Sequence, residues 1–285
     1  MYIKKEYKEG NLTFIELRSE ENSSWLKVVP ERGGIITSLG IHSEELLFIN
    51  EETLHNVDKN IRGGIPILFP ISGQLTNGQY EWDGKTYTMK NHGFARDLPW
   101  EVVEINTYEE EALIKIKLES NDETKTVYPF EFELVFTYIL RENELIIDQT
   151  YLNKSTKDMP IYAGFHPYFK TENKQLKFET DASDYLDYND MQKKRIEGVI
   201  SIDQKESYVL KSDIRSIRFP LEEIDKLVSM NYDEEFPYIV LWSEEGQGFV
   251  CVEPWMAKTD ELNKKDELTM IHPGKTIHTK VSISI

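Results

Sequence analysis

A β-hairpin is predicted by the sequence Gln79-Tyr80-Glu81-Trp82-Asp83-Gly84-Lys85-Thr86-Tyr87-Thr88. Asp83 and Gly84 form the turn, because an Asp-Gly pair supplies the positive φ values that a two-residue turn requires. Similar runs, rich in Ile, Val, Phe, Tyr and Thr, recur along the chain between Asn, Gly, Asp, Glu and Pro residues. Examples are Leu12–Leu17, Leu113–Leu118 and Leu145–Thr150. This pattern indicates strands and not helices.

Few segments carry a helical pattern. Pro220 and Leu221–Leu227 predict one short helix with proline at its start. The polar segment from Asp181 to Glu206 is predicted to be a long loop. No repeat, low-complexity linker or change of composition divides the chain, so we expect one domain over residues 1–285. Many antiparallel strands must cover their edges and inner faces, which predicts an all-β fold, a large antiparallel β-sandwich.

Composition and charge limit the kinds of partner. Hydrophobic residues make up 39% of the 285 residues, enough for a sizeable core. The formal net charge of -18 disfavours nucleic acid and anionic membranes as partners. Cys251 is the single cysteine, so no intrachain disulfide can form. The N-terminus has no run of signal-peptide length and no stretch approaches a bilayer span, so we expect a cytoplasmic protein.

Three short blocks combine ionisable side chains with Gly, Pro and aromatic residues. They are Asn91-His92-Gly93-Phe94-Ala95-Arg96, Gly164-Phe165-His166-Pro167-Tyr168-Phe169 and Cys251-Val252-Glu253-Pro254-Trp255. Pro and Gly fix backbone geometry, rings offer flat apolar walls, and the ionisable groups can move protons near neutral pH. The blocks therefore predict a cleft.

Glu253 is the candidate general base. It shares one face of a predicted strand with Phe249 and Cys251, and both faces of that strand are largely apolar. A carboxylate there is partly desolvated, which raises its pKa toward the range of a general base. The alternative interpretation is a glutamate that forms a salt bridge at the end of a strand.

Two histidines are the other candidates. His166 lies among aromatic residues, so it belongs either to the core or to a site. His92 lies beside Gly93 and four residues before Arg96, which is typical of a loop whose backbone approaches a ligand closely. Its alternative role is a turn histidine that caps backbone groups.

One carboxylate and one imidazole, flanked by rings, suit proton exchange on a sugar. Opening a hemiacetal ring needs one proton removed from the anomeric hydroxyl and another delivered to the ring oxygen. We expect the two groups to face each other across the width of one pyranose, with no metal and no cofactor. The six histidines show no metal-binding spacing, and Cys251 lacks a nucleophile signature and is expected in the core.

Taken together, the blocks resemble the aldose 1-epimerase superfamily, the galactose mutarotase-like β-sandwich proteins. Four blocks occur in the family's order over nearly the whole length: Arg62-Gly63-Gly64-Ile65-Pro66 with Phe69-Pro70, His92–Arg96 with Trp100-Glu101, His166–Phe169, and Glu253-Pro254-Trp255. The resemblance implies a galactose mutarotase-like supersandwich with few short helices, and an isomerase of carbohydrate metabolism.

The resemblance also implies roles for individual residues. Glu253 would be the general base on the anomeric hydroxyl, His166 the general acid at the ring oxygen, and His92 a residue that binds and orients the sugar. Arg62 and Arg96 match arginines that hold an anionic or hydroxylated substrate in the hexose-6-phosphate epimerase-like branch. Further substrate contacts are expected from Gln74 and from one of three aspartates, Asp181, Asp184 or Asp260.

One departure from the family pattern bears on the substrate. Mutarotases of free galactose usually carry an Arg-Tyr-Ala-Asn-Arg type segment where this chain has Arg62-Gly63-Gly64. This places the chain nearer the hexose-6-phosphate epimerase-like or uncharacterised branch. We expect an enzyme that interconverts the α and β anomers of an aldose or aldose 6-phosphate. The alternative is a carbohydrate-binding protein that kept the fold without catalysis, since fold does not fix function.

Overall fold

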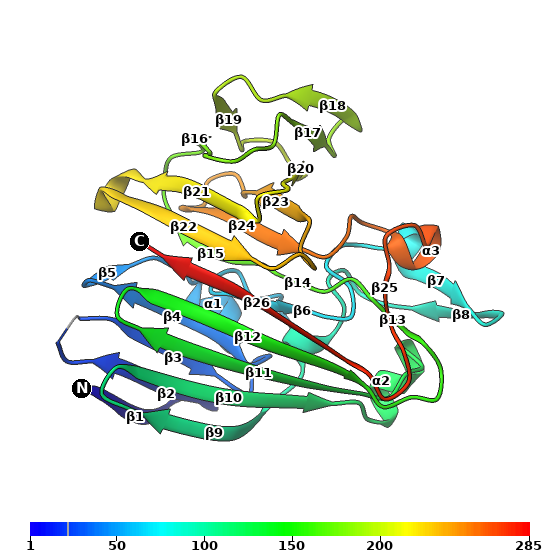
Figure 1. Ribbon diagram of the computed structural model, residues 1–285, viewed down its shortest axis with the longest axis horizontal. Helices are drawn as coiled ribbons and strands as arrows, with labels where there is room; N and C mark the ends of the chain where they lie inside the picture. The colour runs from blue at the N-terminus through cyan, green and yellow to red at the C-terminus, as the bar shows by residue number, and fades with distance from the viewer. Residues whose placement is uncertain (22) are drawn as a thin grey trace.

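A computed structural model describes residues 1–21 and 23–285 of the chain. Strands make up 52% and helices 8% of it, which confirms the prediction of an all-β fold. Its α-helices are short: α1 (Glu51–His55), α2 (Asp122–Val127) and α3 (Glu261–Lys264) (Figure 1). None of the helices in these residues is long and apolar enough to cross a membrane.

A seven-stranded antiparallel sheet forms one layer. In spatial order its strands are β21 (Ser216–Leu221), β22 (Lys226–Tyr232), β26 (Thr276–Ser284), β12 (Glu144–Asn153), β11 (Phe132–Arg141), β10 (Glu111–Glu119) and β9 (Glu101–Thr107). Every second side chain of β11 is buried, because successive side chains of a strand point to opposite faces. The strands predicted at Leu113–Leu118 and Leu145–Thr150 lie within β10 and β12, as expected.

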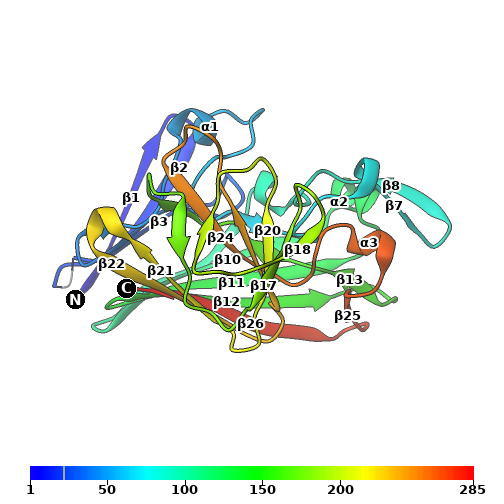
Figure 2. The same ribbon diagram turned by 90° about the horizontal axis from the view of Figure 1, so that it is seen from above.

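An eight-stranded sheet forms the facing layer and carries the candidate site. Its strands are β18 (Gln192–Arg195), β17 (Asp184–Asp187), β20 (Tyr208–Lys211), β23 (Tyr238–Trp242), β24 (Phe249–Trp255), β14 (Gly164–Phe165) and β6 (Ile67–Leu68), with β15 (Tyr168–Lys170) beside β24. Seen from above, β24 lies over the seven-stranded sheet (Figure 2). The rings of Phe136 on β11 and Phe165 on β14 lie 5.9 Å apart, so the two layers share an aromatic core.

A five-stranded sheet continues the sandwich at the N-terminal end. It consists of β1 (Tyr2–Glu9), β2 (Leu12–Ser19), β3 (Trp25–Val29), β4 (Ile35–Ile41) and β5 (Glu44–Glu45). The strand predicted at Leu12–Leu17 lies in β2. The Tyr138 hydroxyl donates a hydrogen bond of 2.8 Å to the Gly34 carbonyl, which ties β11 to the turn between β3 and β4.

Three two-stranded sheets and three 3-10 turns complete the fold. The sheets pair β7 (Gln79–Trp82) with β8 (Lys85–Thr88), β13 (Met159–Ile161) with β25 (Thr269–Ile271), and β16 (Gln175–Lys177) with β19 (Val199–Ser201). The turns are η1 (Thr76–Gly78), η2 (Ala95–Asp97) and η3 (Glu222–Ile224). The predicted hairpin is confirmed, with φ values of 50° at Asp83 and 72° at Gly84.

Two local predictions were wrong. The helix expected at Leu221–Leu227 is a hairpin turn, because β21 and β22 pair up to Leu221 and Lys226 and leave only η3 between them. The loop expected from Asp181 to Glu206 contains β17, β18 and β19. Charged side chains in this segment pair with one another, so they are compatible with strands. Lys194 on β18 contacts Asp187 on β17 at 2.6 Å.

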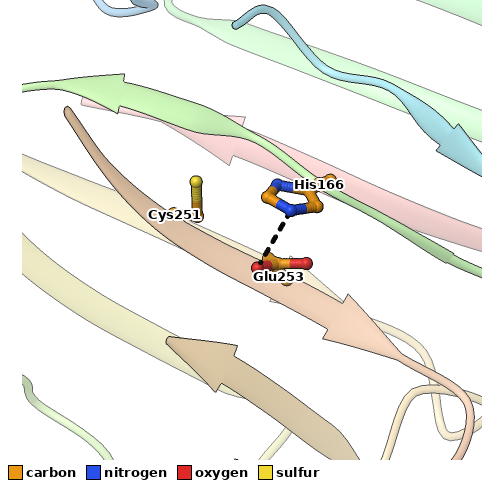
Figure 3. Close-up of side chains that lie close together, drawn as sticks. All are labelled: His166, Cys251 and Glu253. Carbon is orange, nitrogen blue, oxygen red and sulfur yellow. Dashed lines mark ion pairs between the residues drawn. The ribbon is translucent and has the colours of Figure 1, made fainter. Parts of the chain in front are cut away.

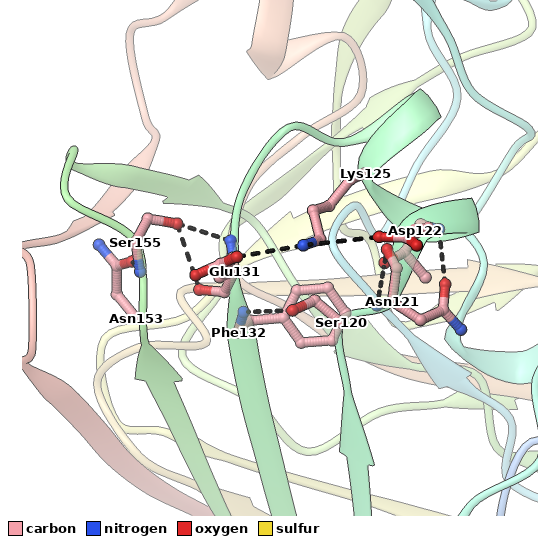
Figure 4. Close-up of polar contacts among 9 residues, drawn as sticks. Ser120, Asn121, Asp122, Lys125, Glu131, Phe132, Asn153 and Ser155 are labelled. Atoms are coloured by element: carbon pink, nitrogen blue, oxygen red, sulfur yellow. Dashed lines mark hydrogen bonds and ion pairs between the residues drawn. The ribbon is translucent and has the colours of Figure 1, made fainter.

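Polar contacts fix α2 to the end of the seven-stranded sheet (Figure 4). Asn121 and Thr124 form a reciprocal capping box, which satisfies backbone N–H groups at the start of α2. The Glu131 N–H donates to the Ser155 hydroxyl at 2.6 Å, and the Glu131 carboxylate pairs with Lys125 at 3.1 Å. The Tyr80 hydroxyl donates to the Val127 carbonyl at 2.8 Å, so the β7–β8 hairpin is anchored at the same end of the molecule.

Candidate active site

Strand β24 carries Glu253 in the middle of the eight-stranded sheet. Glu253 lies opposite Val240 of β23, and β14 and β15 pair with the other edge of β24. The side chain is 1% exposed, and the Trp255 indole N–H donates to its Oε2 at 3.1 Å. Burial raises the pKa of the Glu253 carboxyl well above its ordinary value, although Trp255 and the charge of Arg96 lower it in part.

His166 lies between β14 and β15, and its Nε2 is 3.5 Å from Oε1 of Glu253 (Figure 3). Burial lowers the pKa of the imidazole well below its ordinary value, and the nearby His92 and Arg96 lower it further. The raised pKa of Glu253 favours its protonated form, and the lowered pKa of His166 favours its neutral form. The 3.5 Å contact puts the two groups side by side, so the expectation that they face each other across a pyranose was wrong.

Aromatic rings hold the imidazole of His166 in place. The Tyr168 ring stacks on it with centroids 4.6 Å apart and an angle of 11° between the planes. The Trp242 ring stands perpendicular to it at 5.8 Å. These contacts restrict the rotation of His166, so its Nε2 stays directed at Glu253.

His92 lies in a tight loop beside His166, and the centroids of the two rings are 5.3 Å apart. Its Nδ1 contacts the Ser72 carbonyl, which can only accept, so Nδ1 carries the proton and Nε2 is left as an acceptor. Burial, together with the charge of Arg96, lowers the pKa of His92 to about 3. A β-carbon on Gly93, where φ is +71°, would lie 2.2 Å from the Phe69 carbonyl oxygen. Only glycine permits this approach, and it fixes where His92 enters the site.

The two arginines occupy different places. The Arg62 guanidinium lies 5.4 Å from the Trp242 ring centroid, and its Nε donates to Glu244 Oε2 at 2.9 Å. Arg96 is buried behind the His92 loop, where Nη2 donates to the Asn91 carbonyl at 3.2 Å. Arg62 therefore lines the cleft, whereas Arg96 acts on it only through its charge and the loop.

The cleft has a volume of about 230 Å³. The residues that line it are Arg62, Gln74, Asn91, His92, His166, Tyr188, Lys205, Glu206, Ser207, Trp242, Glu253, Trp255 and Thr259. Tyr188, Lys205 and Glu206 come from the segment that was expected to be a loop, and Ser207 directly follows it. No motif marks these residues in the sequence. Trp242 ends a buried strand, which is the one signal that would have indicated it.

The three candidate aspartates do not line this cleft. Asp260 accepts hydrogen bonds from the backbone N–H and hydroxyl of Thr76 at 2.8 and 2.7 Å. Asp181 accepts from Ser212, and Asp184 pairs with Lys193 at 3.0 Å. All three carboxylates take part in local hydrogen bonds or ion pairs. Asp260, which was expected to contact the sugar, does not line the cleft.

A larger depression of about 560 Å³ lies over β17, β18 and β19. Lys194 is among the residues that line it and contacts Asp187 and Asp190 at 2.6 and 2.7 Å. Neither Glu253 nor a histidine lines it, so the smaller cleft is the better candidate for proton transfer.

Comparisons with known proteins identify the family of the chain. A family model described as aldose 1-epimerase matches residues 19–284. The Slr1438 protein of Synechocystis sp. PCC 6803 is 31% identical, with a TM-score of 0.92 over 98% of this chain and 97% of that one. Protein LacX, chromosomal, of Lactococcus lactis subsp. lactis is 26% identical over 78% of this chain and 85% of its own length. A Cenchrus ciliaris protein named "Putative glucose-6-phosphate 1-epimerase" is 27% identical over 81% of this chain and 67% of its own length.

Proposed function

Because the chain belongs to the aldose 1-epimerase family, we propose that it interconverts the α and β anomers of an aldose or aldose 6-phosphate. The observation that carries the proposal is the buried contact of 3.5 Å between His166 Nε2 and Glu253 Oε1 on the wall of a sugar-sized cleft. The anomeric and ring oxygens of a sugar are bonded to the same carbon. Two groups that lie side by side can therefore reach both oxygens.

The proposed cycle moves one proton at each oxygen. The Glu253 carboxylate takes the proton of the anomeric hydroxyl, the electron pair of that O–H bond forms the carbonyl, and the bond from C1 to the ring oxygen breaks. Protonated His166 gives its proton to the departing ring oxygen. After rotation about C1–C2, the same transfers run in reverse and close the ring on the opposite face of the aldehyde. No proton is gained or lost overall.

The two pKa shifts favour the forms that accompany the open-chain intermediate. That intermediate coexists with a protonated Glu253 and a neutral His166, the forms that burial favours. Ring opening needs the same single proton on the imidazole instead. The distance of 3.5 Å is short enough for that proton to pass between the two groups with little movement of either.

Several residues are suited to bind the sugar. His92 presents an acceptor nitrogen, Gln74 an amide, and the Trp255 and Trp242 rings provide walls against which C–H faces can stack. We propose that Arg62 binds a 6-phosphate at the mouth of the cleft, where the anion would compete with Glu244. The positive charge of Arg96 would attract the phosphate without contacting it, because Arg96 is buried behind the His92 loop.

Anomer exchange measured by NMR on freshly dissolved sugars tests the proposal. Acceleration of the exchange of glucose or glucose 6-phosphate by the purified protein is the expected result. Tight sugar binding without acceleration would instead identify a carbohydrate-binding protein on this fold.

A further inference from the structure

A buried arginine, Arg32, lies in the turn between β3 and β4, and the proposed reaction gives it no role. In the described part of the chain, the hydrogen bonds of its side chain all go to backbone carbonyls. Nε donates to the Leu54 carbonyl at 3.0 Å. Nη2 lies 3.2 Å from each of the carbonyl oxygens of Thr53, Asn56 and Lys59. One guanidinium therefore holds four carbonyls of a single segment.

These carbonyls belong to the end of α1 and to the loop that follows it. The last carbonyls of a helix have no donor within the helix, so they need partners from elsewhere in the chain. Arginine suits this task because its planar group presents five N–H donors in fixed directions, whereas lysine offers one compact ammonium. Arg32 thus fixes the end of α1 in a way that no other side chain can reproduce fully.

The helix α1 in turn holds the backbone of Arg62. The Arg62 N–H donates to the Thr53 hydroxyl at 2.9 Å. The Arg62 carbonyl accepts a hydrogen bond of 2.9 Å from the N–H of Asn50, the N-cap residue of α1. The side chain of Arg62 extends from this fixed backbone to the ring of Trp242 and to the cleft. A displacement of α1 would therefore displace Arg62 as well.

The same turn supports the segment that carries Arg96. A β-carbon on Gly33, where φ is +74°, would lie 2.3 Å from the Arg96 carbonyl oxygen, and the Gly33 N–H donates to the Leu98 carbonyl at 3.1 Å. Only glycine permits this approach. Arg96 Nη2 lies 3.4 Å from Oδ1 of Asn60, which belongs to the loop between α1 and Arg62. The turn thus contacts the segments of both arginines.

We propose that Arg32 is a positioning residue for Arg62: by holding α1, it fixes the Arg62 guanidinium where the phosphate of an aldose 6-phosphate would bind. This inference rests on the proposed function. Without Arg32 the segment would sample other positions, and apparent affinity falls with the fraction of molecules in the competent one. Affinity for the phosphorylated sugar should therefore depend on Arg32, whereas proton transfer by Glu253 and His166 should not.

Hydrogen exchange measured by NMR tests the positioning without any reference to activity. In Arg32→Met, the amides of Asn56 and Arg62 should exchange roughly tenfold faster than in the wild type, while those of β11 should not change. Arg18→Met is the control, because it removes a half-exposed arginine of the same five-stranded sheet, paired with Glu16 at 2.8 Å. It should leave both sets of amides unchanged. Unchanged exchange at Asn56 and Arg62 in Arg32→Met would overturn the proposal.

Kinetics then test whether Arg32 acts through Arg62. Arg32→Met should raise KM for glucose 6-phosphate by about tenfold and should leave kcat and the KM for glucose within about threefold. In an Arg62→Met background, the same change should alter KM for glucose 6-phosphate by less than about twofold, because the group that Arg32 positions is already absent. An equal rise in both backgrounds would overturn the coupling.

Arg32→Lys decides the question if Arg32→Met does not fold. Lysine keeps the charge but cannot reach four carbonyls at once, so KM for glucose 6-phosphate should rise by about threefold and the Arg62 amide should exchange faster. Wild-type values of both would overturn the proposal. If the protein accelerates anomer exchange of no sugar, the proposed function fails, and hydrogen exchange still decides whether Arg32 holds the segment.

Discussion

Replacement of Glu253 by glutamine removes the proposed base and little else. Glutamine has the same shape, and its amide oxygen can still accept the hydrogen bond from the Trp255 indole, which is 3.1 Å long. The side chain is 1% exposed, so water cannot take over the lost function easily. A positioned acid or base contributes roughly 10²- to 10⁴-fold, which corresponds to about 2.7–5.4 kcal/mol of transition-state stabilisation. We expect anomer exchange to slow by this factor in Glu253→Gln.

The stability of the same variant gives a second, independent readout. The folded-state pKa of Glu253 is raised by burial, so its contribution to stability is complete below the unfolded pKa and declines as the pH rises toward the folded pKa. Glutamine cannot ionise and suffers no such decline. Glu253→Gln should therefore unfold at a higher temperature than the wild type, by a margin that grows as the pH rises above about 4.3, the ordinary pKa of glutamate.

NMR exchange spectroscopy and thermal melts over a pH series measure both effects. Glu267→Gln is the matched control, because Glu267 is partly buried but lies outside the cleft, paired with Lys258 at 2.6 Å. It should leave the exchange rate within about twofold and should lower the melting temperature. A Glu253→Gln protein that exchanges anomers within threefold of the wild type would refute the assignment of the base.

Three further predictions follow from the site. The pH profile of exchange should be bell-shaped, because the pair must hold one proton between its two groups. Burial lowers the pKa of His166 and raises that of Glu253, so the acid limb should lie below the ordinary histidine range and the alkaline limb above the ordinary glutamate range. Limbs at the ordinary values would contradict this. Arg62→Met should raise KM for glucose 6-phosphate by roughly 10- to 100-fold, the worth of one charged hydrogen bond, and KM for glucose by less than threefold; equal changes would exclude a phosphate contact. Gly93→Ala should lower the free energy of unfolding, measured in urea, more than Gly84→Ala. Both glycines have positive φ, but only a β-carbon on Gly93 would clash with backbone atoms. Equal losses would show that backbone strain alone matters.

Sequence reasoning succeeded where a local pattern has one physical cause. The Asp83-Gly84 turn needs positive φ values, and alternating residues such as those of Leu113–Leu118 pack one face of a strand, so both were predictable. The burial of Glu253 followed in the same way from the apolar strand around it. Each of these features depends on neighbours within a few residues.

Sequence reasoning failed where distant segments decide the outcome. The polar residues at 181–206 form strands because other strands pair with them. The local sequence contains no pattern that predicts this pairing. Arg62 and Arg96 look equivalent in the sequence, yet only Arg62 reaches the cleft, since the His92 loop covers Arg96. The register of β15 against β24 sets the side-by-side arrangement of His166 and Glu253, and the sequence alone does not reveal this register.

The proposed base lies on a strand, whereas residues at the rim of the cleft lie in loops, and this explains how the fold can keep one reaction and change its substrate. Glu253 lies on a strand paired along both edges, so its position is fixed by backbone hydrogen bonds on each side. Arg62, Glu244 and Lys205 lie in connecting segments at the mouth of the cleft, where replacement disturbs no sheet. A change of sugar or the loss of a phosphate contact can therefore arise at the rim without moving the acid or the base. Exchange of the Glu244–Gly246 turn should thus alter KM among sugars far more than kcat, and a variant that loses kcat instead would place part of the proton-transfer machinery in that turn.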